Sequence, residues 1–122
     1  MKFDEFLDRV QERTGLEDRG EVERTVVTVL QALCDRITGK EARDLLAQLP
    51  AKLKTSVTVT IAQMPMTRDE FVERIGGELQ VSQGEARNRI RAVFATLREA
   101  VSWGELEDVI LELDPEYADL LA

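Results

Sequence analysis

The chain contains one cysteine, Cys34, and no histidine, so the residue types that carry most nucleophilic and metal-assisted chemistry are scarce. Ser–His and Cys–His activation both need an imidazole, which is also a common ligand of zinc and haem. Cys34 falls on the same side of a helical pattern as Leu30 and Ile37, where a buried thiol behaves as a small apolar group. The sequence therefore predicts no catalytic residue, no metal site and no bound cofactor.

Carboxylates are plentiful, and one pair has a spacing that could do chemistry. Glu105 and Asp108 lie three residues apart and share a helix face, as the two acids of a glycosidase must share a site. Acids on helix surfaces are common, and the chain contains neither a calcium-binding loop nor a glycine-rich phosphate loop. We interpret the pair as surface residues. An enzyme with a carboxylate or arginine site between the halves of the chain stays an alternative.

The one basic cluster of the chain consists of Arg87, Arg89, Arg91 and Arg98. Positions 87, 91 and 98 fall on one face of a predicted helix, so they could contact the phosphates of a nucleic acid. Ion pairing with neighbouring acids is the simpler interpretation. Trp103, the single tryptophan, follows a predicted cap serine, and it either anchors a partner or packs over the start of a helix.

The formal net charge of −8 arises entirely at the C-terminal end. Acids and bases cancel through Arg98, with 16 of each, and the remaining residues include eight acids and no base. The eight are Glu99, Glu105, Glu107, Asp108, Glu112, Asp114, Glu116 and Asp119. Such a surface repels nucleic acid and anionic lipid and favours a basic partner, unless it serves only to keep the protein soluble. The candidate partner-binding residues are Trp103, Glu105, Asp108, Glu112, Arg87, Arg91 and Arg98.

Length and patterning bound the class of protein. A chain of 122 residues can bury one substantial core as a single domain. Its apolar stretches are interrupted by charges, and none approaches the roughly 20 residues that cross a bilayer. The start of the chain, MKFDE, has acids at once and lacks the apolar segment of a signal peptide. We expect a cytoplasmic protein without a membrane partner, and the sequence is compatible with a homo-oligomer.

An internal repeat organises the chain. With an offset of 65, the segment DEFLDRV at residues 4–10 aligns with DEFVERI at residues 69–75. With an offset of 64, the aligned pairs are Glu41 with Glu105, Asp44 with Asp108 and Leu49 with Leu113. Each unit alone would be too small for a substantial core, so we expect the two to pack face to face about a pseudo-two-fold axis.

Helix-start signals recur at matching places in both units. Thr67, Ser82 and Ser102 are each followed three residues later by a glutamate, which is the capping-box pattern. Asp18 and Thr38 occupy the counterpart positions in the first unit. We expect each cap side chain to accept from the third helical amide while the glutamate accepts from the cap amide.

Between these signals apolar residues recur every three or four positions, the period of an α-helix. The pattern predicts one domain, residues 1–122, with repeat one at 1–54, a linker at 55–66 and repeat two at 67–122. Alternating β-branched residues in the linker indicate extended chain lying across the bundle, and a further short helix is expected at residues 115–121. We therefore predict an all-α protein, a six- to seven-helix bundle of two tandem three-helix repeats with pseudo-two-fold symmetry.

The same segments resemble a known bacterial family. DEFLDRV at residues 4–10, ITGKEA at 37–42 and QLP at 48–50 are similar to the motifs of domain of unknown function 2267. The segment AVSWGELEDV at residues 100–109 repeats the match, so the resemblance covers nearly the whole chain. It implies the tandem three-helix fold, and it brings no assigned activity, cofactor or catalytic residue.

A looser resemblance covers residues 66–105, which are similar to the first two helices of histone-like DNA-bending proteins. Those helices dimerise, whereas DNA is held by basic β-arms, and at that point this chain has acidic residues. The resemblance therefore implies helix packing alone. Our leading hypothesis is a small non-enzymatic cytosolic interaction or regulatory module that binds protein. A nucleic-acid-associated protein that uses the arginines at 87, 91 and 98 is the alternative.

Overall fold

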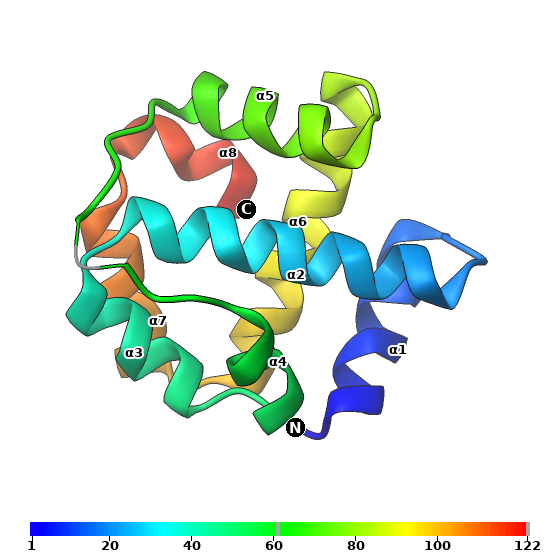
Figure 1. The fold of residues 1–122 in the computed structure, drawn as a ribbon, viewed down its shortest axis with the longest axis horizontal. Coiled ribbons are helices and arrows are strands. Elements are labelled where there is room, and N and C mark those ends of the chain that lie inside the picture. Colours follow the sequence, from blue (N-terminus) through cyan, green and yellow to red (C-terminus); the bar gives the residue numbers. More distant parts are fainter. Residues whose placement is uncertain (61, 122) are drawn as a thin grey trace.

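A computed structural model gives the fold and describes residues 1–60 and 62–121 (Figure 1). These residues form eight α-helices and one 3-10 helix, and no strand occurs among them. The helices are α1 (Phe3–Thr14), α2 (Arg19–Arg36), α3 (Gly39–Ala47), α4 (Ala51–Ser56), α5 (Arg68–Leu79), α6 (Gln83–Ala100), α7 (Trp103–Glu112), η1 (Pro115–Tyr117) and α8 (Ala118–Leu121). The predicted all-α class is confirmed.

The structure has more helices than the predicted six to seven because short helical segments follow α3 and α7. Helix α4 begins after Pro50 and extends through Ser56, two residues past Lys54, where repeat one was expected to end. The segment η1 begins at Pro115, whose fixed φ and missing amide hydrogen suit the first position of a helix. It continues into α8, so Tyr117 and Leu120 are both fully buried, as the docking of this last segment predicted.

All five predicted helix starts have a side-chain cap. The cap residues are Asp18, Thr38, Thr67, Ser82 and Ser102. Each accepts a hydrogen bond from the amide three residues on, which satisfies a group that the helix itself leaves unpaired. Such a cap stabilises a helix by about 1 kcal/mol, so these five positions fix where the helices begin.

The reciprocal half of the capping box forms only at α5, where the Thr67 amide donates to Glu70 over 2.9 Å. At the other four starts the expectation of a complete box is wrong for the described residues. Glu21 and Glu85 bind the guanidinium of Arg89 instead. Glu41 and Glu105 turn toward each other where α3 packs on α7. For Glu21 and Glu85, an ion pair with Arg89 therefore replaces the hydrogen bond to the cap amide.

The two longest helices, α2 and α6, are in contact at the centre of the molecule (Figure 1). Helix α1 packs on both of them, and so does α5, so residues from both halves of the chain form one buried cluster. Val26, Leu30, Val93 and Leu97 of the central helices are fully buried. No described helix combines the length and the apolar character needed to span a membrane.

A buried arginine joins the two central helices. Arg89 of α6 is 5% exposed, and its Nη1 donates to Glu21 over 2.8 Å and to the Thr25 hydroxyl over 3.1 Å, both on α2. Glu85 lies 3.5 Å from its Nε. A charge removed from water is tolerated only with such partners, so Arg89 fixes the register of α6 on α2.

Helices α3 and α7 are joined at both ends by hydrogen bonds from the end of one helix to the N-cap residue of the other. Glu112 at the end of α7 accepts from the Thr38 amide over 2.7 Å and from its hydroxyl over 2.8 Å. Gln48, just after α3, accepts from the Ser102 amide over 2.7 Å and donates to its hydroxyl over 3.3 Å. Because the end of each helix binds the start of the other, the two helices run antiparallel.

The segment between α4 and α5 lies along α2 without regular structure in its described residues. The Gln31 side chain accepts from the Thr58 amide and donates to the Thr58 carbonyl, both over 2.9 Å. Farther along, the Met64 amide donates to the Asp35 carbonyl over 2.8 Å. The predicted linker is thus fastened to α2, while Ile61, part of the predicted alternation, lies outside the described residues.

Removing the Glu112 carboxylate should destabilise the fold. The variant Glu112→Ala leaves the Thr38 amide without its acceptor, and we expect a loss of about 1–2 kcal/mol in the free energy of unfolding. Urea titration followed by circular dichroism measures it. The matched control is Glu107→Ala on the exposed side of the same helix, for which we expect a change within about 0.5 kcal/mol. Equal effects of the two substitutions would contradict the structural role of Glu112.

Candidate functional site

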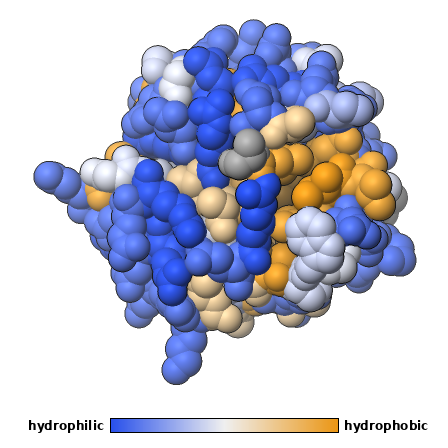
Figure 2. Space-filling model, turned by 180° about the vertical axis from the view of Figure 1, so that it is seen from behind, coloured by the Kyte–Doolittle hydropathy of each residue, from blue (hydrophilic) through white to orange (hydrophobic). Residues whose placement is uncertain are grey.

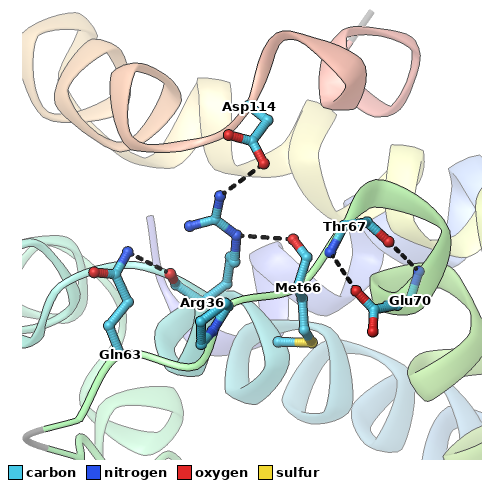
Figure 3. A pocket seen from close by; sticks show the side chains of 7 residues that line it. Arg36, Gln63, Met66, Thr67, Glu70 and Asp114 are labelled. Carbon is cyan, nitrogen blue, oxygen red and sulfur yellow. Dashed lines mark hydrogen bonds and ion pairs between the residues drawn. The ribbon is translucent and has the colours of Figure 1, made fainter.

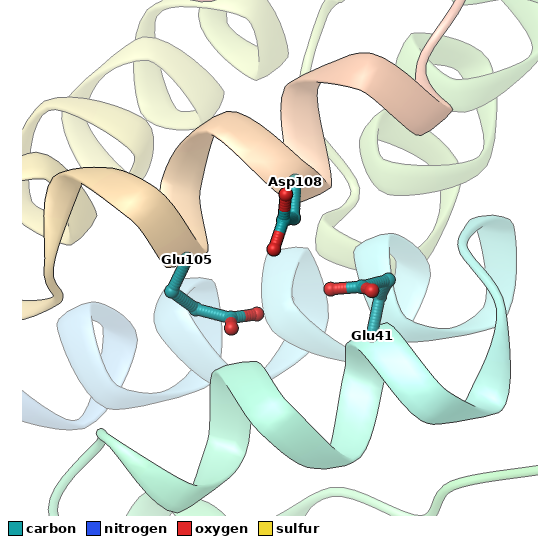
Figure 4. Close-up of side chains that lie close together, drawn as sticks. All are labelled: Glu41, Glu105 and Asp108. Atoms are coloured by element: carbon teal, nitrogen blue, oxygen red, sulfur yellow. The ribbon is translucent and has the colours of Figure 1, made fainter.

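Three carboxylates meet where α3 packs on α7 (Figure 4). Glu41 comes from the first turn of α3, and Glu105 and Asp108 come from α7, with one oxygen of each within 4.8 Å of the others. Oε2 of Glu41 and Oε1 of Glu105 are buried and have no hydrogen-bond partner among the described residues. The helix starts place them there, because Glu41 and Glu105 each follow a cap residue by three positions.

The electrostatics of this carboxylate cluster favour a bound proton. Burial, followed by the charges of Glu41, Asp44 and Asp108, raises the pKa of Glu105 to about 7. Its carboxyl group can therefore gain or lose a proton near neutral pH.

Hard cations such as Mg²⁺ and Ca²⁺ also prefer carboxylate oxygens, so among the residues that the structure describes these three are the group that could hold a metal ion. The interpretation of this pair as surface residues holds for Asp108, which is exposed, whereas Glu105 is half-buried.

Most of the C-terminal acids form ion pairs or hydrogen bonds with other residues of the same chain. Glu112 binds Thr38, as described above, and the other contacts of this group are ion pairs or backbone hydrogen bonds. They are Glu99 with Arg9 and Arg13, Asp114 with Arg36, Asp119 with Arg68 and Arg91, and Glu116 with the Arg68 amide. The exposed acids Glu107 and Asp108 have no ion-pair partner among the described residues. The free negative surface of this end is therefore smaller than the sequence indicates.

The arginines of α6 do not form one basic surface. Arg89 is buried against α2, as described above. Arg91 donates to the Asp119 carbonyl over 3.0 Å and lies 3.6 Å from its carboxylate, so internal pairing accounts for it as expected. Arg87 is half-buried and Arg98 is exposed, and no acid pairs with either among the described residues. The nucleic-acid hypothesis stays a prediction that rests on these two side chains.

Helix α7 presents an apolar surface to solvent. Trp103 is 67% exposed and Leu111 is 75% exposed, so the interpretation in which the indole packs over the helix start is wrong. Where α7 meets η1 and α8, a hollow of about 340 Å³ is lined by Ile110, Leu111, Leu113, Asp114, Pro115, Ala118 and Leu121. Figure 2 shows apolar side chains gathered on this side of the molecule around a hollow. We call Trp103, Ile110, Leu111, Ala118 and Leu121 together the α7–α8 face.

A second hollow, of about 410 Å³, surrounds the guanidinium of Arg36 (Figure 3). The Arg36 side chain is 8% exposed, donates to the Met66 carbonyl over 3.0 Å and reaches Asp114 at 3.2 Å. Glu70 at the start of α5 lines the same hollow. Glu70 is turned to the Thr67 amide, so Asp114 is the acid that pairs with the arginine (Figure 3). The hydrogen bond from Arg36 to the Met66 carbonyl fastens the chain before α5 to the end of α2.

Sequence reasoning missed Glu41 and Leu111. The predicted repeat aligns Glu41 with Glu105, and the predicted pseudo-two-fold symmetry would bring such corresponding residues together near its axis, so the alignment contained a signal for this contact. Leu106, Val109 and Leu113 form the buried face, and Leu111 points away from it. The helical period of the sequence is enough to show that Leu111 lies off that face. Cys34, by contrast, is buried as expected, and burial raises the pKa of its thiol to about 12, which leaves it protonated and unreactive at neutral pH.

The carboxylate cluster should make stability depend on pH. An unfolded glutamate has a pKa near 4.5 and Glu105 in the fold has a pKa of about 7, so between these values the folded state binds more protons. Stability then falls as the pH rises through this window. Glu105→Gln keeps the shape without the charge, and we expect its Tm to match the wild type near pH 4.5 and exceed it by about 3 °C at pH 8. Parallel Tm curves for the two proteins would contradict this, and Glu107→Gln is the exposed control.

The family model described as "Uncharacterized conserved protein" matches residues 3–120, from the start of α1 into α8. No curated protein matches the chain. The match covers more than half of the chain and includes all four segments that carried the resemblance in sequence, residues 4–10, 37–42, 48–50 and 100–109. The chain therefore belongs to the DUF2267 family.

Proposed function

We propose that the chain is a small, non-enzymatic, cytosolic module that binds another protein through the α7–α8 face. The observation that carries this proposal is the exposure of Trp103 and Leu111 on one helix, at 67% and 75%. Large apolar side chains exposed together beside a hollow are typical of docking surfaces, and tryptophan is enriched among residues that dominate binding energy. Leu106 and Val109 of α7, and Leu113 directly after it, are all buried in the core.

The position of these side chains on α7 supports a single surface. At 3.6 residues per turn, Trp103 and Ile110 lie about 20° apart around the helix, and Leu111 lies about 80° from Trp103. Ile110 and Leu111 both line the hollow between α7 and α8, and Ala118 and Leu121 form its far wall. A partner side chain seated in the hollow would therefore touch both helices.

Charge selects the kind of partner. Glu107 and Asp108 are exposed on α7, and no lysine or arginine follows Arg98 in the chain. A symmetric dimer through the α7–α8 face would bring the Glu107 side chains of two copies together, which is unfavourable between like charges. Anionic lipid would meet the same repulsion. We therefore favour a different protein with basic residues around an apolar anchor.

The proposal includes a finer architecture of two related halves. Helices α1, α2 and α3 have 12, 18 and 9 residues, and α5, α6 and α7 have 12, 18 and 10. Glu112 binds Thr38 as Gln48 binds Ser102, and in each case the corresponding residues are 64 positions apart. The ion pairs of Arg9 with Glu99 and of Arg74 with Asp35 also correspond, with offsets of 65 for the arginines and 64 for the acids. These reciprocal contacts support a pseudo-two-fold axis through the α3–α7 contact.

Substitutions on the α7–α8 face should abolish partner retention. A tagged chain purified from the cells that naturally make it should retain a specific protein, and Leu111→Asp or Trp103→Ala should reduce the retained amount about tenfold or more. Quantitative mass spectrometry of the retained proteins measures it. Both residues are exposed, so we expect the Tm of each variant to stay within about 2 °C of the wild type.

The matched control for this experiment is Met64→Asp. Met64 is the other large apolar side chain exposed among the described residues, at 47%, and it lies in the segment before α5 rather than on α7. Retention should survive this change. A partner retained equally by Leu111→Asp, or the absence of any specific protein on the wild-type chain, would overturn the proposed function.

A further inference from the structure

The contact between α3 and α7 buries carboxylate oxygens that have no partner. Oε2 of Glu41 and Oε1 of Glu105 are removed from solvent and accept no hydrogen bond from a described residue. The two side chains point toward each other from opposite helices, and each has an oxygen within 4.8 Å of one on the other (Figure 4). Among the described residues one cation pairs with them, Lys40, which lies 3.6 Å from Oε1 of Glu41 and is 75% exposed. Two ionised carboxylates in this place would lack both hydration and an internal partner, so the arrangement favours a bound proton.

The charged groups that act on this pair all come from α3 and α7. Burial raises the pKa of Glu105 to about 7 together with three neighbouring carboxylates, and a single lysine opposes them. The carboxylates are Glu41, Asp44 and Asp108, and the lysine is Lys40. Helices α2, α4 and α6, which also pack on α3 or α7, contribute no charged group to it among the described residues. Because the chain contains no histidine, few other groups change charge near neutral pH.

The position of α7 depends on this contact. The main contacts of α7 with other helices are with α3 and with α6, which leads directly into it. Both ends of α7 are tied to α3, by the hydrogen bonds of Glu112 to Thr38 and of Ser102 to Gln48. The carboxylates of Glu41 and Glu105 lie between these two fastened ends. Repulsion between the carboxylates therefore acts across the contact that holds α7 in place.

Helix α7 also forms one wall of the hollow on the α7–α8 face. Ile110 and Leu111 belong to α7, whereas Ala118 and Leu121 on the other wall belong to α8. This second wall is held separately, because α8 packs on α6 and Tyr117 just before it is fully buried. A movement of α7 away from α3 therefore changes how the two walls face each other.

We infer that the α3–α7 contact is a proton-operated switch of the α7–α8 face: a proton held between Glu41 and Glu105 keeps α7 against α3, and its loss releases α7 and weakens partner binding. This inference rests on the proposed function and names how the same surface is regulated. Buried charges without partners are relieved when water reaches them, which for this pair requires α7 to move away from α3. If only the protonated form binds, a pKa of about 7 makes the competent fraction about ten times larger at pH 6 than at pH 8.

Two-dimensional NMR across neutral pH tests the switch in the protein alone. The backbone amides of α7 and the indole of Trp103 should shift with one common midpoint near pH 7. The amides of Ala118 and Leu121, on the other wall of the hollow, should shift with the same midpoint because α7 moves against them. No transition near pH 7, or one that is confined to α3 and α7, would overturn the inference.

Three variants and two cations identify what the carboxylates bind. Glu105→Gln should abolish the transition, and Glu41→Gln should move its midpoint to lower pH because one opposing charge is removed. Glu107→Gln, on the exposed side of the same helix, is the matched control and should leave the midpoint unchanged. Millimolar Mg²⁺ or Ca²⁺ at constant ionic strength should also leave it unchanged. A midpoint lowered by either ion would show that the carboxylates bind a cation, which would overturn the proton as their ligand.

Partner retention at two pH values tests the regulation. The tagged wild-type chain should retain about tenfold more of its partner at pH 6 than at pH 8, whereas Glu105→Gln should retain equal amounts at both. Circular dichroism at each pH checks that the fold is retained. The same pH dependence in the wild type and in Glu105→Gln would overturn the switch. Absence of a retained protein at every pH would overturn the proposed function instead, while the NMR titration still decides whether a proton moves α7.

Discussion

The structure depends on an exchange of packing between the two halves of the chain. Helix α1 lies on α6 as well as on α2, and α5 lies on α2 as well as on α6. Neither central helix could bury its apolar residues against its own half alone, so the core is one cluster drawn from both. This exchange fixes the crossing of α2 and α6, and Arg89 with its partners on α2 sets their register. Because α3 and α7 follow the central helices directly, their contact is a consequence of that crossing.

The contact between α3 and α7 explains the unusual use of acids in this protein. Glutamates at the third helical position, which would otherwise complete capping boxes, meet as Glu41 and Glu105 and raise the pKa of one of them. Glu112 caps the neighbouring helix instead of facing solvent. Several of the remaining C-terminal acids balance arginines from distant helices, such as Arg36 and Arg68. The acidic end of the chain therefore acts largely as a set of internal partners, and apolar exposure on α7 becomes the more informative feature of that surface.

The sequence predicted the helices better than the sites. Helix starts followed from caps such as Ser82 and Ser102, because a side-chain acceptor at a helix start is a local interaction. The candidate residues Trp103, Glu105 and Asp108 proved to lie in two different environments, although all three are on α7. Trp103 belongs to the exposed apolar face, whereas Glu105 is half-buried against α3. Helical periodicity gives the angle of a residue around its own axis, but it does not say which neighbour stands at that angle.

The amino-acid sequence by itself determined the helical class, the places where the main helices begin, and the absence of histidine and of a second cysteine. These depend on residue type and on spacing within a few positions. Only the tertiary structure decided that Glu99 and Asp119 would be paired with arginines, that Glu41 would face Glu105, and that Leu111 would stay uncovered. Those outcomes depend on which surfaces meet when α1 and α5 cross over to the opposite central helix. Net charge along a chain is unchanged by folding, but the share of it that reaches solvent is set by contacts between residues far apart in sequence.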